Sequence, residues 1–115
     1  MAKLGAGKSA FRKLGDRCIR AARVADEHEE KGELEEALKL WKQIIVFINK
    51  FKTSDYYDDL PLGERRIVTK LRKLARKAKA RTKKKIEVRD DAKEDMDEFI
   101  KWARRARAEA EQAAA

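Results

Sequence analysis

Residues 33–52 most limit how this chain can fold, because one amphipathic pattern runs through the whole stretch. Successive residues turn by about 100° around a helix axis, which places the apolar side chains of the stretch, except Val46, within an arc of roughly 180°. An ordinary surface helix needs an apolar stripe only somewhat wider than about 100°. We therefore expect a central helix that touches a neighbour on each side and that the rest of the chain covers.

The composition indicates that the other elements are helices as well. The chain has 115 residues, which suits one domain, and it contains only five glycines and one proline. No apolar run approaches the roughly 18 residues that a membrane-spanning helix needs. The basic N-terminus has no continuous apolar segment of the kind found in secretory signals. With Cys18 as its single cysteine, the chain has no internal disulfide, and we expect a cytoplasmic protein.

The predicted fold is all-α, an antiparallel three-helix bundle with an additional C-terminal helix in a single domain, residues 1–115. Gly32 is expected to end the first helix in a left-handed conformation, and the loop can hold one helical turn at 54–59. The helices are expected at about residues 9–31, 33–52, 61–85 and 90–112, with a connecting loop at 53–60.

The sequence does not settle where the third predicted helix ends and the fourth begins. No glycine or proline forces a break between them near residues 87–90, but we expect one, because four short helices bury Phe99, Ile100 and Trp102 and one long helix does not. The inner stripe of the third helix is expected to consist of Ile67, Leu71, Leu74 and Ala78, with Val68 and Ala75 at its flanks.

The sequence offers no set of residues for catalysis. Residues 5–9, GAGKS, resemble the end of a phosphate-binding P-loop, but they lack the first glycine and a preceding strand. His28 lies in an acidic stretch, where a metal site would need more ligands from a facing helix, and Cys18 lies on an apolar stripe, where a lone thiol is a small core residue. We therefore expect a protein that is not an enzyme and that uses no metal, cofactor or small-molecule substrate.

The first two predicted helices carry the pattern A-x2-A-x6-G-x4-A-L-x2-W-x2-I-I, and this pattern resembles two helical families. One is the tetratricopeptide repeat, although no second copy follows about 34 residues later. The other is the MIT (microtubule-interacting and trafficking) domain, to whose basic third helix GERRIVTKLRKLARKAK is similar. Together the resemblance covers about residues 9–82. The pattern falls on Ala22, Ala25, Gly32, Ala37, Leu38, Trp41, Ile44 and Ile45.

The resemblance implies a small adaptor that receives an amphipathic protein segment between its second and third helices. Because the third helix here is strongly basic, the partner segment should be acidic. The alternative is that these apolar side chains are simply covered by the fourth predicted helix. The residues expected to line this groove are Leu40, Phe47, Phe51, Val68 and Ala75.

The uneven charge supports a second hypothesis, nucleic-acid binding. The chain carries a net charge of +9, and residues 61–89 alone hold 13 basic and 2 acidic side chains. No aromatic residue interrupts this run, so contacts to the backbone of DNA or of folded RNA, including ribosomal RNA, are expected rather than base stacking. The alternatives are a solvated charged face and an acidic membrane surface, for which the helix offers no spare apolar face. The candidate residues are Arg65, Arg66, Lys70, Arg72, Lys73, Arg76, Lys77, Lys79, Arg81, Lys83, Lys84 and Lys85.

Overall fold

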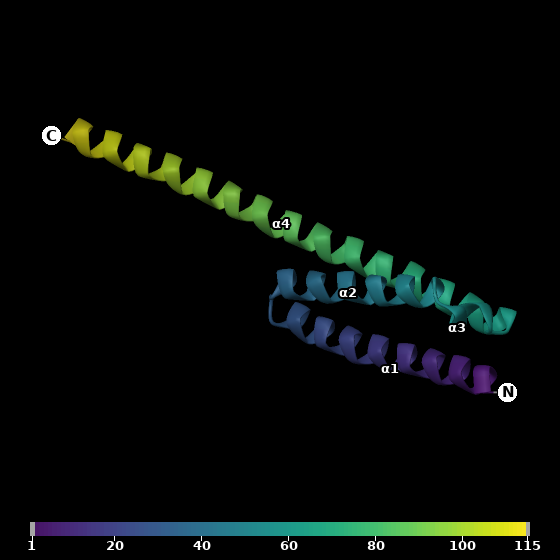
Figure 1. Cartoon of the computed structure of the whole chain (residues 1–115). Helices are drawn as coiled ribbons and strands as arrows, with labels where there is room; N and C mark the ends of the chain where they lie inside the picture. Colours follow the sequence, from purple (N-terminus) through teal and green to yellow (C-terminus); the bar gives the residue numbers. More distant parts are fainter. Residues whose placement is uncertain (1, 115) are drawn as a thin grey trace. The chain divides into compact units, whose positions relative to one another are not determined.

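The computed structural model describes the backbone of residues 2–114 and the side chains of residues 7–113. The described chain contains four helices and no strand, which confirms the all-α prediction: α1 (Ala2–Glu30), α2 (Leu34–Lys52), α3 (Asp55–Asp58) and α4 (Leu62–Ala114) (Figure 1). The chain divides into two units, Met1–Lys83 and Lys84–Ala115, whereas we expected a single domain. Helix α4 contributes residues to both units.

Helix α1 begins earlier than the sequence indicated. We expected it to begin at about residue 9, but the backbone is helical from Ala2. A glycine costs a helix only about 1 kcal/mol relative to alanine, so Gly5 and Gly7 do not stop it. Gly7 is also buried, and a Cβ atom there would lie 3.7 Å from the carbonyl oxygen of Tyr56. Gly7, which lies before the expected start of the helix, thus packs against α3.

Gly32 ends α1 as predicted. Its φ is +79°, a left-handed conformation that residues with a Cβ atom rarely adopt. Its N–H donates to the carbonyl oxygen of Glu29 at 3.0 Å, and the N–H of Glu33 donates to that of His28 at 2.8 Å. This pair of bonds is the Schellman motif, which satisfies the free carbonyl groups at a helix end. The chain therefore reverses within a few residues.

The connection between α2 and α4 is short and held by side chains. The hydroxyl of Ser54 donates to the carbonyl oxygen of Phe51 at 2.6 Å, and α3 follows as a single turn within the predicted loop. Leu60, which follows α3 in the sequence, is buried. The carbonyl oxygen of Pro61 accepts the N–H groups of Glu64 and Arg65, both at 3.1 Å, so α4 starts one residue after the proline.

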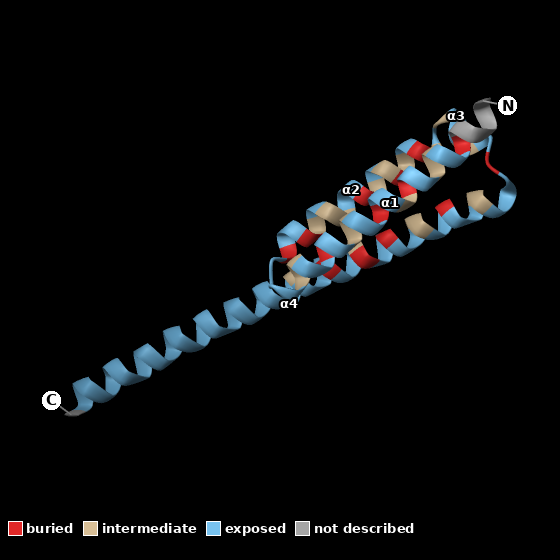
Figure 2. Cartoon of the chain, turned by 90° about the horizontal axis from the view of Figure 1, so that it is seen from below, coloured by how far each residue is buried: buried red, intermediate tan, exposed pale blue. Residues whose placement is uncertain are grey.

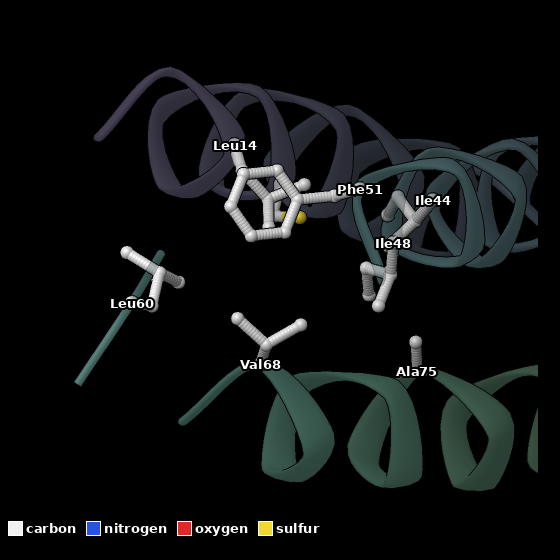
Figure 3. Close-up of a cluster of buried hydrophobic side chains, with 8 residues drawn as sticks. Leu14, Ile44, Ile48, Phe51, Leu60, Val68 and Ala75 are labelled. Carbon is white, nitrogen blue, oxygen red and sulfur yellow. The ribbon is translucent and has the colours of Figure 1, made fainter. Parts of the chain in front are cut away.

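The core of the first unit lies between α1, α2 and the first part of α4. Figure 3 shows side chains from these helices pointing toward one another. Ile48 and Val68 are fully buried, and each such side chain stabilises the fold by about 1.5–3 kcal/mol. Figure 2 shows the buried positions repeating along the facing sides of the helices. The cluster consists of Leu14, Cys18, Ile44, Ile48, Phe51, Leu60, Val68 and Ala75.

The inner stripe of α4 differs from the predicted one. Val68 and Ala75, expected at the flanks, are buried with Ala78, whereas Ile67 and Leu74 are 50% and 48% exposed. The two sets are neighbours on the helix, about 100° apart. The sequence therefore located the apolar side of the helix but not its centre.

The expected break near residues 87–90 is absent, since α4 continues through it to Ala114. Asp90, at the expected start of the fourth helix, lies within α4 and accepts hydrogen bonds from the guanidinium of Arg89 at 3.2 and 3.3 Å. Good helix formers occupy this region, and no glycine or proline interrupts it. The side chains of residues 87–113 are all exposed, including Phe99 and Trp102, which we expected to be buried.

Candidate functional site: a basic helix face

The basic side chains of α4 gather on the side of the helix that faces away from the core. Within the first unit, the fully exposed ones follow one another at intervals that keep them on that side, over about 25 Å at a rise of about 1.5 Å per residue. We call these seven residues the basic face: Arg66, Lys70, Lys73, Arg76, Lys77, Arg81 and Lys83.

No residue of the basic face makes an ion pair with another described side chain. The only acidic residue between positions 61 and 83 is Glu64. Surfaces of proteins normally intersperse both signs of charge. The face therefore carries an uncompensated positive potential that attracts anions.

The remaining predicted cations have other surroundings. Arg65 is half-buried, and its guanidinium donates to the carbonyl oxygens of Leu60 at 2.8 Å and Asp58 at 3.2 Å, which fixes the start of α4. Lys79 is half-buried. Lys84 and Lys85 are exposed and belong to the second unit. Arg65 thus has a structural role at the start of α4.

Arg72 lies beside a shallow hollow in the surface of α4. The hollow has a volume of about 390 Å³, and its lining includes Lys73, Arg76 and Lys77 together with Thr69. The Nε atom of Arg72 is buried and has no hydrogen-bond partner among the described residues. Arginine recognises phosphate through paired N–H donors, so this cluster is the part of the helix best suited to hold one.

The predicted groove between α2 and α4 is largely filled by the protein itself. Phe51, Val68 and Ala75 are members of the buried core, with at most 8% of their surface exposed. Leu40 and Phe47 are half-buried. Three of the five residues are thus packed in the core of the first unit, which contains no residue of the fourth predicted helix that the alternative expected to cover them.

An open apolar hollow lies elsewhere, between α1, α2 and α3. Its volume is about 710 Å³, and Leu14, Phe47 and Phe51 contribute apolar lining. The guanidinium carbon of Arg17 lies 4.7 Å from the centre of the Phe47 ring. Four cations line this hollow with one acid, Asp16, and none of the four makes an ion pair with a described side chain. They are Lys13, Arg17, Arg20 and Lys50.

The cations on the α1 side of this hollow were not among the residues that we expected to form a site. Lys13, Arg17 and Arg20 recur at intervals of four and three residues, which places them on one side of a helix. That pattern was available in the sequence. The sequence does not show that Phe47, which belongs to α2, lies beside these cations.

The residues considered for catalysis remain separate from one another. His28 Nδ1 lies 3.2 Å from Oε2 of Glu33 at the turn after α1, and Cys18 is in the core, where burial raises the pKa of its thiol. Residues 5–9 belong to α1 and not to a loop after a strand. Within the described part of the chain, no three potential ligands gather around a metal position.

Comparison with known proteins places the chain in no established group: no protein family, curated protein or solved structure matched it. Among the described residues, no helix combines the length and apolar character needed to cross a membrane.

Proposed function

We propose that this protein binds the phosphodiester backbone of duplex DNA or folded RNA through the basic face of α4. The observation that carries the proposal is the row of seven exposed cations without ion pairs. Like charges held along one helix repel one another, and a polyanion relieves this repulsion. Each phosphate contact also releases counterions from the nucleic acid, which favours binding.

The chemistry of the face favours backbone contacts over sequence recognition. Residues 61–85 contain no aromatic side chain, so unpaired bases find no stacking platform there. Lysine and arginine contacts to phosphate fix the position of a protein on a duplex but carry little sequence information. We expect similar affinity for different sequences, with the hollow beside Arg72 holding one phosphate.

The test is a fluorescence-anisotropy titration with labelled duplex DNA and labelled structured RNA at two salt concentrations. The test variant is Lys73→Glu/Arg76→Glu/Lys77→Glu. A matched control, Arg23→Glu/Lys31→Glu/Lys42→Glu, changes the net charge equally at exposed positions outside the basic face. The titrations with DNA and with RNA distinguish the two nucleic acids.

If the basic face binds phosphates, the test variant loses binding and the control keeps most of it. The dependence of log Kd on log salt should also become shallower by about 0.9 per lost contact with duplex DNA. Equal losses in both variants would mean that only net charge matters, and the proposal would then be wrong. No binding at low salt by the unmodified protein would exclude it altogether.

The hollow between α1, α2 and α3 favours a second candidate function, an adaptor that binds an acidic amphipathic protein helix. Phe47 offers apolar contact, and the four surrounding cations complement acidic residues on the flanks of such a helix. The partner is of the class that the resemblance implied, an acidic protein segment. The binding site, however, is the hollow between α1, α2 and α3 and not a groove between the second and third predicted helices.

A synthetic amphipathic peptide with leucines on one face and glutamates on the other tests the second candidate. Arg17→Glu/Arg20→Glu should abolish its binding, measured by calorimetric titration. Arg12→Glu/Arg23→Glu, at exposed positions of the same helix outside the hollow, should retain it. Retention of binding by the first variant would assign the peptide to another surface and contradict this candidate.

A further inference from the structure

The apolar side chains of residues 88–113, which belong to the second unit, are all exposed. Phe99 is 70% exposed, Met96 58% and Trp102 53%. Isolated helices gain little stability in water from their own hydrogen bonds, and most helices in proteins are stabilised by packing of an apolar face. Exposed apolar stripes of this kind mark association surfaces.

The spacing of these side chains is that of a coiled coil. Ala92, Met96, Phe99, Ala103, Ala106 and Ala110 follow at intervals of four, three, four, three and four residues, which is the heptad pattern. We call these six residues the seam. All six are exposed, and Ile100 and Trp102 widen the stripe at its middle.

The two halves of the helix are complementary in charge. Residues 87–98 carry seven acidic and two basic side chains, whereas residues 99–111 carry four basic and two acidic ones. Within the second half, Glu109 pairs with Arg105 and Glu111 with Arg107, so Lys101 and Arg104 supply its net positive charge. An antiparallel pair of these helices brings the acidic half of each toward the basic half of the other. A parallel pair brings the two acidic halves together.

The halves are also complementary in size. Met96 and Phe99 are bulky, and the seam positions that follow them are alanines. An antiparallel pair whose overlap is centred after Phe99 places the bulky residues of each helix against the alanines of the other. Small residues opposite large ones permit close packing. A surface complementary to itself in this way fits a two-fold symmetric interface between identical chains.

We propose that residues 92–110 associate with the same residues of a second copy of this chain as an antiparallel helix pair. The six seam residues form the contact, and the acidic side chains of one copy lie toward Lys101 and Arg104 of the other. This proposal uses no residue of the basic face, so it does not depend on the proposed function.

Sedimentation velocity over a series of protein concentrations tests the association. Ala106→Asp places a charge in the seam, and Ala108→Asp is a matched control on the opposite side of the same helix. Both changes lower helix propensity equally, so a difference between them reports the contact and not the stability of the helix. We expect Ala106→Asp to weaken the dimer at least about tenfold, because a buried unpaired charge is costly, and Ala108→Asp to leave it nearly unchanged.

The direction of the pair is measured with a nitroxide label on Ala92→Cys in a Cys18→Ala background. In an antiparallel pair the two labelled positions lie about 25–40 Å apart at about 1.5 Å per residue, whereas in a parallel pair they lie about 10 Å apart. Pulsed electron spin resonance distinguishes these distances. A monomer at every concentration, equal effects of the two aspartates, or the short distance would each overturn the proposal.

Discussion

Thr82 in α4 and Glu29 in α1 are joined by a hydrogen bond of 3.0 Å between the threonine hydroxyl and Oε1 of the carboxylate. The same hydroxyl lies 2.9 Å from the carbonyl oxygen of Ala78. Thr82 is the only buried polar side chain among the described residues of the core, with none of its surface exposed. The bond therefore links the end of α1 to α4 and joins a fully buried hydroxyl to the carboxylate of the half-buried Glu29.

Thr82→Val should lower the free energy of unfolding by about 1–2 kcal/mol, because it keeps the shape but removes a donor to a carboxylate. Urea unfolding followed by circular dichroism measures this change. Thr69→Val is the matched control, since Thr69 is exposed on the same helix. A loss of equal size in both variants would show that the effect comes from the β-branched side chain and not from the bond.

Gly32→Ala and Gly15→Ala should change stability in opposite directions. Gly32 has a φ of +79°, so alanine there is strained and should cost about 1–2 kcal/mol. Gly15 lies inside α1 with nothing within 4 Å of an added Cβ atom, so alanine should stabilise the helix by about 0.5–1 kcal/mol. Thermal unfolding of the two variants beside the unmodified protein measures both. A stabilising Gly32→Ala would contradict the left-handed turn.

Alkaline pH should destabilise the protein through Cys18. Burial raises the pKa of its thiol above the ordinary value of 9.0, so the unfolded chain loses this proton at lower pH than the folded one. The thiol's contribution to stability is complete below pH 9 and declines as the pH rises beyond it. Unfolding midpoints at pH 8 to 10.5 should fall more steeply for the unmodified protein than for Cys18→Ala. Parallel curves would exclude this effect.

Trp41→Phe should cost less than about 1 kcal/mol or even stabilise the fold. The Nε1 atom of Trp41 is buried and has no hydrogen-bond partner among the described residues, so phenylalanine removes an unsatisfied donor while keeping an aromatic ring. Urea unfolding measures the change. Trp41→Ala is the contrasting variant, and it should cost about 3 kcal/mol because it leaves a cavity. A large loss with phenylalanine would indicate that water or another group satisfies Nε1.

Local features of the fold were predictable because they depend on neighbouring residues. The apolar arc of residues 33–52 predicted α2 to within one residue at its start, and Gly32 predicted the turn before it. Val46, the one apolar residue outside the arc, is 49% exposed. The start of α1 was misplaced, and Gly7, which precedes the expected start, lies against α3, which the sequence does not show to be near.

The basic face was predictable from the sequence, whereas the apolar groove was not. The cations of α4 are numerous enough that any rotation of the helix leaves most of them in water, and the basic face follows from the sequence. The apolar groove depended on which residues of α2 and α4 meet. Val68 and Phe51 turned inward, and the open hollow formed instead beside Phe47.

The sequence by itself determined that this protein is helical, that its first two helices reverse at Gly32 and that α4 is basic, since periodicity, backbone freedom and charge are properties of short stretches. Only the tertiary structure decided that Val68 rather than Ile67 is buried, that Thr82 meets Glu29, and which apolar side chains remain open. The physical reason is that adjacent residues of a helix differ by about 100° in direction, and the rotation of each helix about its axis is set by packing against partners distant in the sequence.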